Sequence, residues 1–346
     1  MKVKKMIKTR ILLFGCMLFL IGMRNLSLPV YAGLAAKHIS ARQNTSMPRL
    51  TEKLQKKIAA TVPEEPAGSD VRLVHGATLL ATRRVPQGYT SDGTYYYYLS
   101  CMGFSGKDSA RLRLTRVRYE EDGTYQEDFM TLKGFGHGTN LDCVSYKGKT
   151  WLWTGSDAKN GTGYSTSISC FPYQKGKTLK KHAKYHYRIP ISGKGNAINC
   201  FPAVSEDGSL LAVRYTNSGK QSFKIFSLKK GHVINNRHPL KTFSIKNTAG
   251  DFQGFDISGS TIYTIEGSAS KAERKELKKA YHPIKIRSYN YASGKTGVRT
   301  VRGAYKLSHR EPEGIQVRGT NQIEFGLASH YKDKYTCMNI YQYLSN

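Results

Sequence analysis

The sequence predicts an all-β protein folded as a five-bladed β-propeller. Five short phrases recur between residues 71 and 346, each an alternating polar and apolar run around a turn glycine. Another alternating strand follows each phrase, and in the first four copies a further extended segment follows that strand. Repeats of about 40–60 residues with four short strands are typical of propeller blades. A β-sandwich or a pair of β-domains with coincidental spacing is the alternative. The turn glycines are Gly93, Gly148, Gly208, Gly259 and Gly319.

The fifth copy is shorter than the others because the sequence ends at Asn346. Its last blade therefore lacks one strand. The segment VRLVHGATLLA, residues 71–81, precedes the first phrase and has the composition of a strand. We expect this N-terminal strand to complete the last blade and so to close the ring.

Two segments precede the predicted propeller. Residues 1–32 begin with a basic stretch, continue with one apolar run and end in V-Y-A, the pattern of a secretory signal peptide cleaved after Ala32. An uncleaved N-terminal anchor is the alternative. Residues 33–70 are polar and contain proline, which predicts a flexible or loosely docked leader with a weakly helical patch at 50–60. The expected location is extracellular or associated with the cell wall.

The chain is strongly basic, with a formal net charge of +30. Residues 1–32 carry six Lys or Arg and no acid, so the exported chain would carry +24. A charge of this size favours polyanions, which outside a cell are teichoic acids, acidic glycans and anionic membrane surfaces. Nucleic acid is a poor match for an exported chain without a nucleic-acid motif. Excess lysine that only solvates the surface is the alternative. We expect a monomer.

The cysteine pattern indicates core packing rather than metal binding. Five cysteines follow the signal segment, an odd number whose spacing fits no C-x-x-C metal motif. Four lie in β-like runs, where free cysteine behaves as a small apolar residue. One or two disulfides would also suit the compartment. Trp151 and Trp153 share one strand face and are expected in the core. The five cysteines are Cys101, Cys143, Cys170, Cys200 and Cys337.

Polar residues lead the innermost strand of four blades. Gln87, Asp142, Gln253 and Glu313 each stand six residues before a turn glycine, and glycine follows three of them. Glycine suits the axis, where converging strands leave no room for side chains. The polar residues would form either a ligand-binding ring at the channel mouth or a set that only satisfies backbone groups.

The loop GFGHGTN, residues 134–140, places His137 among three glycines that allow a tight bend and a close approach of ligand. The loop lacks the Lys-Ser/Thr ending of a phosphate loop. His137 would donate to a sugar hydroxyl or phosphate oxygen, or serve as a hydrogen-bonded channel histidine. The predicted ligand-binding residues at the channel mouth are Gln87, His137, Asn140, Asp142, Gln253, Asp256, Arg310, Glu313 and His330.

The sequence favours a binding protein and leaves enzyme activity open. Asp142, Asp256 and Glu313 are candidate carboxylates, and two carboxylates about 5–10 Å apart can cleave a glycoside. Alternation within QGFDI puts Gln253 and Asp256 on opposite faces of their strand, which argues against their convergence. No G-x-S-x-G or H-E-x-x-H motif is present, and nothing indicates a cofactor or metal.

Several segments resemble a known family in order along the chain. The phrases GFGHGTNLDCVSYKGKTWLWTGSD, FPAVSEDGSLLAVRYTNSGKQSFKIFSL, DFQGFDISGSTIYTIEG and EPEGIQVRGTNQIEFGLASHYKDKYTCMNIYQY are similar to segments of the helveticin J family of large bacteriocins. They also resemble the five-bladed propeller of phage receptor-binding proteins and related exported proteins of Gram-positive bacteria. The residues that match the family pattern are His137, Gln253, Gly254, Asp256, Glu313, Ile315, 203–205 and 328–330.

The resemblance implies a secreted antibacterial or envelope-binding propeller rather than a defined reaction. Two departures put the same activity in doubt: an export signal, which helveticin J lacks, and a much more basic composition. The alternatives are a hydrolase or lyase acting on wall glycan or teichoic acid, and a wall-binding protein without toxicity.

Two basic clusters between strands, in loops or a short helical insertion, suit a phosphodiester polymer or form a solvated surface. Their predicted polyanion-binding residues are Lys180, Lys181, Lys184, Arg188, Lys275, Lys278 and Lys279.

Overall fold

The chain divides into two units, residues 1–41 and 42–346. The structure, a computed structural model, describes only residues of the second unit, so the predicted signal peptide and its cleavage site lie outside the described residues. The described ranges are 52–80, 86–103, 110–159, 163–189, 198–217, 220–246, 250–319, 322–331 and 335–344.

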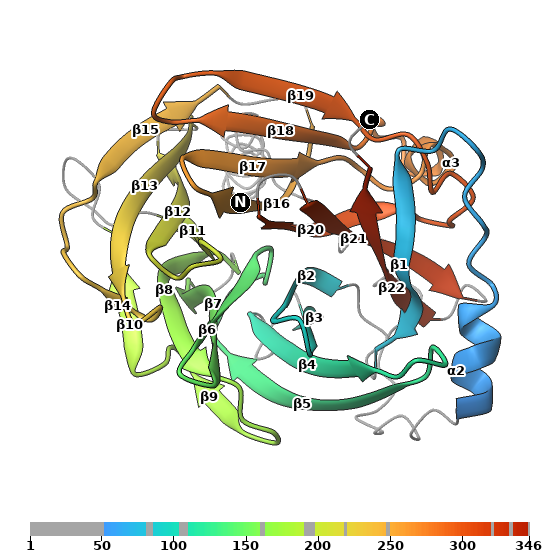
Figure 1. Ribbon diagram of the computed structural model, residues 1–346, viewed down its shortest axis with the longest axis horizontal. Helices are drawn as coiled ribbons and strands as arrows, with labels where there is room; N and C mark the ends of the chain where they lie inside the picture. The colour runs from blue at the N-terminus through green and yellow to red at the C-terminus, as the bar shows by residue number, and fades with distance from the viewer. Residues whose placement is uncertain are drawn as a thin grey trace, which may run out of the picture. The chain divides into compact units, whose positions relative to one another are not determined.

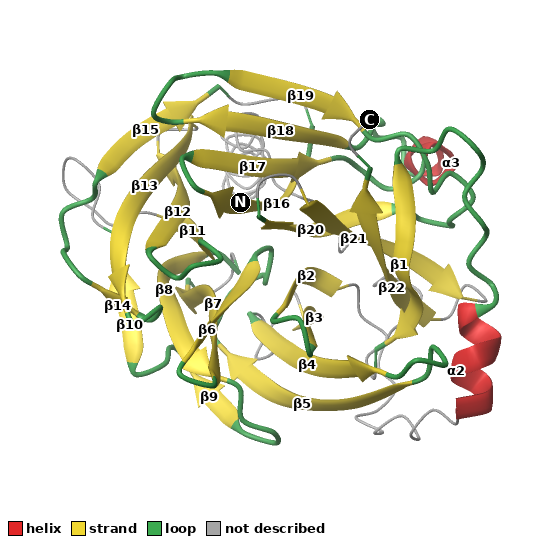
Figure 2. Ribbon diagram, viewed as in Figure 1, coloured by secondary structure: helices red, strands yellow, loops and turns green. Residues whose placement is uncertain are grey.

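Five antiparallel sheets surround a common centre, which confirms the five-bladed propeller (Figures 1 and 2). Blade 1 contains β2 (Pro86–Ser91), β3 (Tyr96–Gly103), β4 (Arg111–Tyr119) and β5 (Tyr125–Lys133), with β9 (Thr178–Lys180) added parallel to β5. Blade 2 contains β6 (Leu141–Tyr146), β7 (Lys149–Ala158), β8 (Ser165–Pro172) and β10 (Tyr185–Arg188).

The other three blades repeat the arrangement. Blade 3 contains β11 (Ile198–Val204), β12 (Leu210–Asn217) and β13 (Lys220–Lys229), and β13 pairs with both β14 (Val233–Ile234) and β15 (Lys241–Ile245). Blade 4 contains β16 (Phe252–Ser258), β17 (Thr261–Glu266), β18 (Lys285–Asn290) and β19 (Thr296–Thr300). Blade 5 contains β20 (Glu311–Arg318), β21 (Gln322–Tyr331), β22 (Tyr335–Tyr343) and β1 (Val71–Leu79).

The predicted turn glycines connect the first and second strands of their blades. All five adopt positive φ angles, between 53° and 91°, which side chains other than glycine adopt at a cost. In blade 2, for example, Tyr146 pairs with Lys149 across the turn at Gly148. The spacing of these glycines therefore identified the repeat correctly.

The N-terminal strand closes the ring, as predicted. β1 pairs antiparallel with β22, from Val71 opposite Tyr343 to Leu79 opposite Cys337. Blade 5 therefore takes its outer strand from the start of the propeller and its other three from the end. This clasp also contacts blade 1, because the Tyr125 hydroxyl donates to Leu79 O and accepts from Leu79 N.

Residues 52–70 dock on the propeller, whereas the sequence left open whether the leader over 33–70 is flexible or loosely docked. The helix α2 (Glu52–Ala59) coincides with the weakly helical patch and lies beside β1 (Figure 1). Gln55 exchanges two hydrogen bonds with the backbone of Tyr125. Asp70 forms an ion pair with Arg302 at 2.9 Å. These specific polar contacts, which composition does not reveal, hold this half of the leader in place.

The core lies between neighbouring blades. Five apolar clusters each join two adjacent sheets, as where Leu114 of blade 1 packs with Leu152 of blade 2. Trp153 is fully buried with Trp151 packed against its cluster, as predicted. All five cysteines after the signal segment are buried and none of them forms a disulfide, which confirms that they are core residues.

The strand directions define two faces. We call the face where the innermost strands β2, β6, β11, β16 and β20 begin the top face, and the opposite one the bottom face. Because the second strand of each blade runs antiparallel to the first, β7 and β17 end at the top face. The short helix α3 (Lys271–Glu276) follows β17 and therefore lies at the top face as well. No helix among the described residues is long and apolar enough to cross a membrane.

Candidate functional site

Backbone fills the axis of the propeller where three predicted glycines meet. A Cβ atom on Gly88 would lie 2.9 Å from the carbonyl oxygen of Gly138, and one on Gly254 would lie 3.0 Å from Cα of Gly314. Real Cβ atoms do not come this close to backbone, so only glycine fits. Strands of blades 1, 4 and 5 thus approach one another directly, as the sequence predicted.

A buried carboxyl pair links blades 2 and 4 beneath this level. Asp142 accepts hydrogen bonds from the backbone N–H groups of Cys143 and Val204, and Asp256 accepts from those of Ile257 and Val317. The two carboxyls also hydrogen-bond to each other. Burial raises the pKa of Asp142 to about 6, and burial with the nearby Asp142 charge raises that of Asp256 well above its usual value. The pair therefore retains a proton near neutral pH.

The side chain of Asn140, in blade 2, joins blades 3 and 4 to its own blade by hydrogen bonds. Its side-chain N–H donates to Pro202 O at 2.7 Å, and its side-chain oxygen accepts from the N–H of Phe255 at 2.9 Å. With Asp142 and Asp256, it satisfies backbone groups of the innermost strands. The side chains of these three residues thus hydrogen-bond to backbone groups of the propeller. This is the second of the two interpretations given for the polar residues at the axis.

A chain of polar groups joins blades 4 and 5 at the top face. The side-chain amide of Gln253 donates to Glu311 at 3.0 Å, and His309 lies between Glu311 at 3.0 Å and Glu273 at 2.6 Å. Burial alone would lower the pKa of His309, but hydrogen bonds with the two carboxylates raise it to about 9. His309 is thus an imidazolium at neutral pH and donates from both ring nitrogens. Gln253 lies in this chain and Asp256 in the carboxyl pair, as their opposite strand faces predicted.

Glu313 is a buried carboxyl next to this chain. Only 2 % of the residue is exposed, and no hydrogen bond to its carboxyl is found among the described residues. Burial raises its pKa well above the usual value, and the charge of Glu311 raises it further. Burial and the Glu311 charge thus both favour the protonated form of Glu313, which can donate a proton or a hydrogen bond.

The loop at 134–140 places His137 and Gln87 on opposite sides of a blade boundary. Gly136 and Gly138 flank His137 with φ angles of 97° and 89°. An added Cβ on Gly138 would lie 3.5 Å from Cβ of Gln87. Both side chains are half-buried, and burial lowers the pKa of His137 to about 4, so the ring is neutral. These two residues retain the partial exposure that a ligand requires.

Arg310 and His330 do not join the central group. The Arg310 guanidinium donates to Gly303 O at 2.8 Å and lies over the Tyr305 ring, so it supports a loop. These bonds occupy Nε and one terminal nitrogen of Arg310, and ligand binding by Arg310 stays a prediction. The His330 ring stacks on His309 with centroids 4.6 Å apart. It also lines a cavity of about 470 Å³ beside β1.

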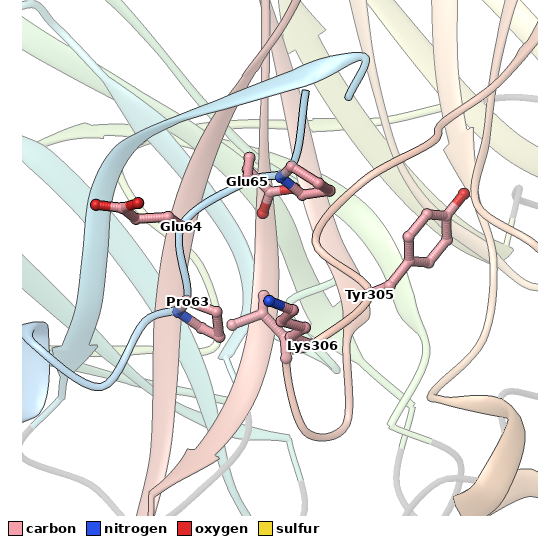
Figure 3. A pocket seen from close by; sticks show the side chains of 7 residues that line it. Pro63, Glu64, Glu65, Tyr305 and Lys306 are labelled. Carbon is pink, nitrogen blue, oxygen red and sulfur yellow. The ribbon is translucent and has the colours of Figure 1, made fainter. Parts of the chain in front are cut away.

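A smaller cavity adjoins that one where the docked segment meets blade 5 (Figure 3). Its volume is about 160 Å³, and Pro63, Glu65, Tyr305 and Lys306 contribute to its lining. One carboxylate oxygen of Glu65 accepts from the N–H of Ala304, which ties the segment down. Neither cavity includes a residue of the innermost strands.

The two predicted basic clusters lie at the top face except for Lys184, which comes before Tyr185 and therefore lies lower on the side of blade 2, because Tyr185 pairs with Cys170. Lys180 pairs with Lys133, the last residue of β5, and β5 ends at the top face. The carbonyl of Lys181 accepts a hydrogen bond from the N–H of Asp157, near the top end of β7. The second cluster lies on and after α3. The topology therefore puts these cations around the same face as His137 and Gln253. The exposed members are Lys180, Lys181, Lys184, Arg188, Lys275 and Lys278, and Lys279 is half-buried.

Sequence reasoning missed His309, Glu311 and Glu273. The signal for Glu311 was the sequence E-P-E at 311–313, which places two acids two residues apart at the start of the innermost strand β20. His309 and Arg310 both have positive φ angles, 69° and 54°, an unusual pair for residues with side chains. Glu273 comes from α3 and could be found only from the folded chain.

Comparison with known proteins agrees with this architecture. Residues 115–323 match the family described as the phage 5-bladed beta propeller receptor binding platform domain. The chain belongs to this family. The match begins in β4 of blade 1 and ends in β21 of blade 5, so it contains His137, Gln253 and Glu313.

Two relatives extend the comparison. "Putative major teichoic acid biosynthesis protein C" of Bacillus subtilis (strain 168) is 29% identical over 217 residues, which are 61% of this chain and 47% of that protein. The tail fiber of Staphylococcus aureus phage P68 has a TM-score of 0.58 at 18% identity, over 80% of this chain and 53% of that one. The chain thus matches about half the length of each, and the tail fiber supports the fold alone.

Proposed function

We propose that this protein is an exported propeller that binds an anionic polymer of the Gram-positive cell wall, with teichoic acid as the first candidate. The observation that carries the proposal is the match of 115–323 to a receptor-binding platform domain. The name of the Bacillus relative, which refers to teichoic acid, supports the choice of polymer.

Charge and topology support the same proposal. The chain has a formal net charge of +30, and both basic clusters, apart from Lys184, lie at the same face as half-buried His137. Cationic side chains attract a phosphodiester polymer, and half-buried polar groups can then contact its sugar or polyol hydroxyls. The axis is less suited to recognition, because hydrogen bonds within the fold already use the polar atoms of Asn140, Asp142 and Asp256. We therefore expect the polymer to contact side chains at the rim of the top face.

The experiment is sedimentation of the exported chain, residues 33–346, with purified Gram-positive walls. We expect binding at low salt and release as salt rises, because the screening length falls from about 10 Å at 0.1 M to about 3 Å at 1 M. Walls from which teichoic acid has been removed should bind much less. Equal binding to stripped walls would exclude teichoic acid as the receptor.

Glu313 favours a second candidate function, an envelope hydrolase or lyase. Burial favours the protonated form of Glu313, and a second carboxyl, Glu311, lies close to it, an arrangement that suits general acid–base catalysis. For an enzyme, Glu313→Gln should abolish release of soluble wall fragments and leave wall binding nearly intact. For a binding protein, no fragments should appear with the wild type, and the substitution should alter only affinity.

Antibacterial activity is the finer proposal. It rests on the resemblance of the sequence motifs to helveticin J, and export after cleavage near Ala32 rests on the signal pattern. A growth-inhibition assay against related Gram-positive bacteria separates a bacteriocin from a wall-binding protein without toxicity.

A further inference from the structure

Asp157, His182 and His186 form a compact cluster at the top face of blade 2. Their potential ligand atoms all lie within 4.8 Å of one another. Nδ1 of His182 is 2.8 Å from one carboxylate oxygen of Asp157, and Nε2 of His186 is 3.9 Å from the other. The two imidazole rings stack with centroids 4.0 Å apart and planes 13° apart. Both rings thus present a nitrogen to the same carboxylate.

The fold fixes the central carboxylate. Asp157 has a φ of 48°, in the left-handed region that residues with a Cβ seldom adopt. Its backbone is held on both sides, since its N–H donates to Lys181 O and its carbonyl accepts from the Thr166 hydroxyl. The Ser167 hydroxyl donates to the carboxylate oxygen that faces His186. A hydrogen-bonded carboxylate on a restrained backbone is the arrangement in which metal ligands are oriented by their neighbours.

The donor set is that of a zinc site. Two imidazole nitrogens and one carboxylate oxygen are typical ligands of Zn²⁺, whereas Mg²⁺ and Ca²⁺ prefer oxygen alone. Tetrahedral ligands at about 2.0–2.1 Å from zinc lie about 3.3 Å apart. The distances of 2.8 Å and 3.9 Å therefore lie on either side of that value. The His182 side chain is 41 % exposed, so its rotation can bring the ligand atoms to the separation that zinc requires.

We propose that Asp157, His182 and His186 bind one Zn²⁺ ion and leave its fourth position open to water or an anion. The chain brings the ligands from three places: the end of β7, the loop after β9, and β10. The sequence showed only H-A-K-Y-H within a basic stretch, because the aspartate lies 25 residues before the first histidine.

Neighbouring cations set the expected affinity. Lys180, Lys181, Lys184 and Arg188 are exposed on the same segment and oppose the approach of a metal ion. The same charges favour an anion at the fourth position once the ion is bound. We therefore expect binding in the micromolar range rather than the tighter binding of a closed structural zinc site.

The test is calorimetric titration of ZnCl₂ into the metal-free exported chain, residues 33–346, without a polyhistidine tag. The wild type should bind one Zn²⁺ per chain, and Mg²⁺ should give no comparable binding. Asp157→Asn and His186→Asn should each weaken binding by at least 10-fold, and Ser167→Ala by about 10-fold. His238→Asn, at an exposed histidine in blade 3, is the matched control and should bind as the wild type does.

A second measurement keeps the test informative if a variant is less stable. Zn²⁺ should raise the thermal midpoint of the wild type and of His238→Asn, because a ligand that binds only the folded state stabilises it. It should not raise that of Asp157→Asn or His186→Asn. Absence of saturable binding by the wild type, or unchanged binding by both ligand variants, would overturn the proposal.

Discussion

The imidazolium of His309 should make the stability of the propeller depend on pH between about 6.5 and 9. His309 is 7 % exposed and lies between Glu273 and Glu311, which raise its pKa to about 9 from the usual 6.5. Below pH 6.5 the folded and unfolded states both hold the proton, and the full contribution of the ion pairs is present. As pH rises through 9 the folded state loses the proton, and that contribution is lost.

The magnitude follows from the two pKa values. A difference between 6.5 and about 9 corresponds to about 3 kcal/mol of unfolding free energy. The perturbation is His309→Gln, which can still donate to one carboxylate but carries no charge at any pH. The wild type should lose about 3 kcal/mol more than this variant does between pH 6 and pH 9.5.

The assay is urea unfolding of both proteins at several pH values, followed by tryptophan fluorescence. Asp142, Asp256 and Glu313 are present in both proteins, so their titrations cancel in the difference. If the two unfolding free energies change with pH in parallel, within about 0.5 kcal/mol, then His309 is not held as an imidazolium. The hydrogen bonds that connect His309 through Glu311 to Gln253 would then have to be explained without a charged His309.

Three further predictions concern the contacts that hold the blades together. Asn140→Ala removes the hydrogen bonds to Pro202 and Phe255 and should lower the free energy of unfolding in urea by about 2–4 kcal/mol, while the folded fraction keeps its wall affinity. A loss under 0.5 kcal/mol would show that Asn140 does not hold the three blades together. Gly88→Ala forces a Cβ against Gly138 O and should destabilise by about 1–3 kcal/mol, and an unchanged melting temperature would show that the axis is not tightly packed. Tyr125→Phe removes both bonds to Leu79 and should speed hydrogen exchange in β1 more than in β8; equal changes in both strands would argue against the clasp contact.

The repeat and its closure could be predicted because local physics encodes them. Turn glycines with positive φ and strands of alternating polarity recur in each blade, and the strand-like segment 71–81 before the first repeat predicted β1. The position of Gln253 relative to Asp256 followed from the two-residue period of a strand. These features need no knowledge of distant contacts.

The partners of the site residues could not be predicted in the same way. Asp142 and Asp256 lie in blades 2 and 4, which are not neighbours, and only ring closure brings them together. Arg310 follows His309 in a pair of residues with positive φ, so its side chain leaves the direction that an extended strand would give it. Asp157 meets His182 and His186 because β9 pairs with the preceding blade, a crossing that no local pattern indicates.

The central claim is that the top face binds an anionic wall polymer, and paired charge variants test it most directly. The top variant changes Lys180, Lys181, Arg188 and Lys275 to glutamine. The bottom variant changes Lys147, Lys149, Lys229 and Lys230, which are exposed at or beside the bottom ends of β6 and β13, to glutamine. Both variants lose four positive charges.

The measurement is the affinity for purified teichoic acid across a salt series. The account predicts that the top variant binds more weakly and that its log affinity falls less steeply with log salt, by up to about 3, by analogy with counterion release from nucleic acids. The bottom variant should bind nearly as the wild type does. Equal losses in both variants would show that net charge alone attracts the polymer, and would contradict a binding site at the top face.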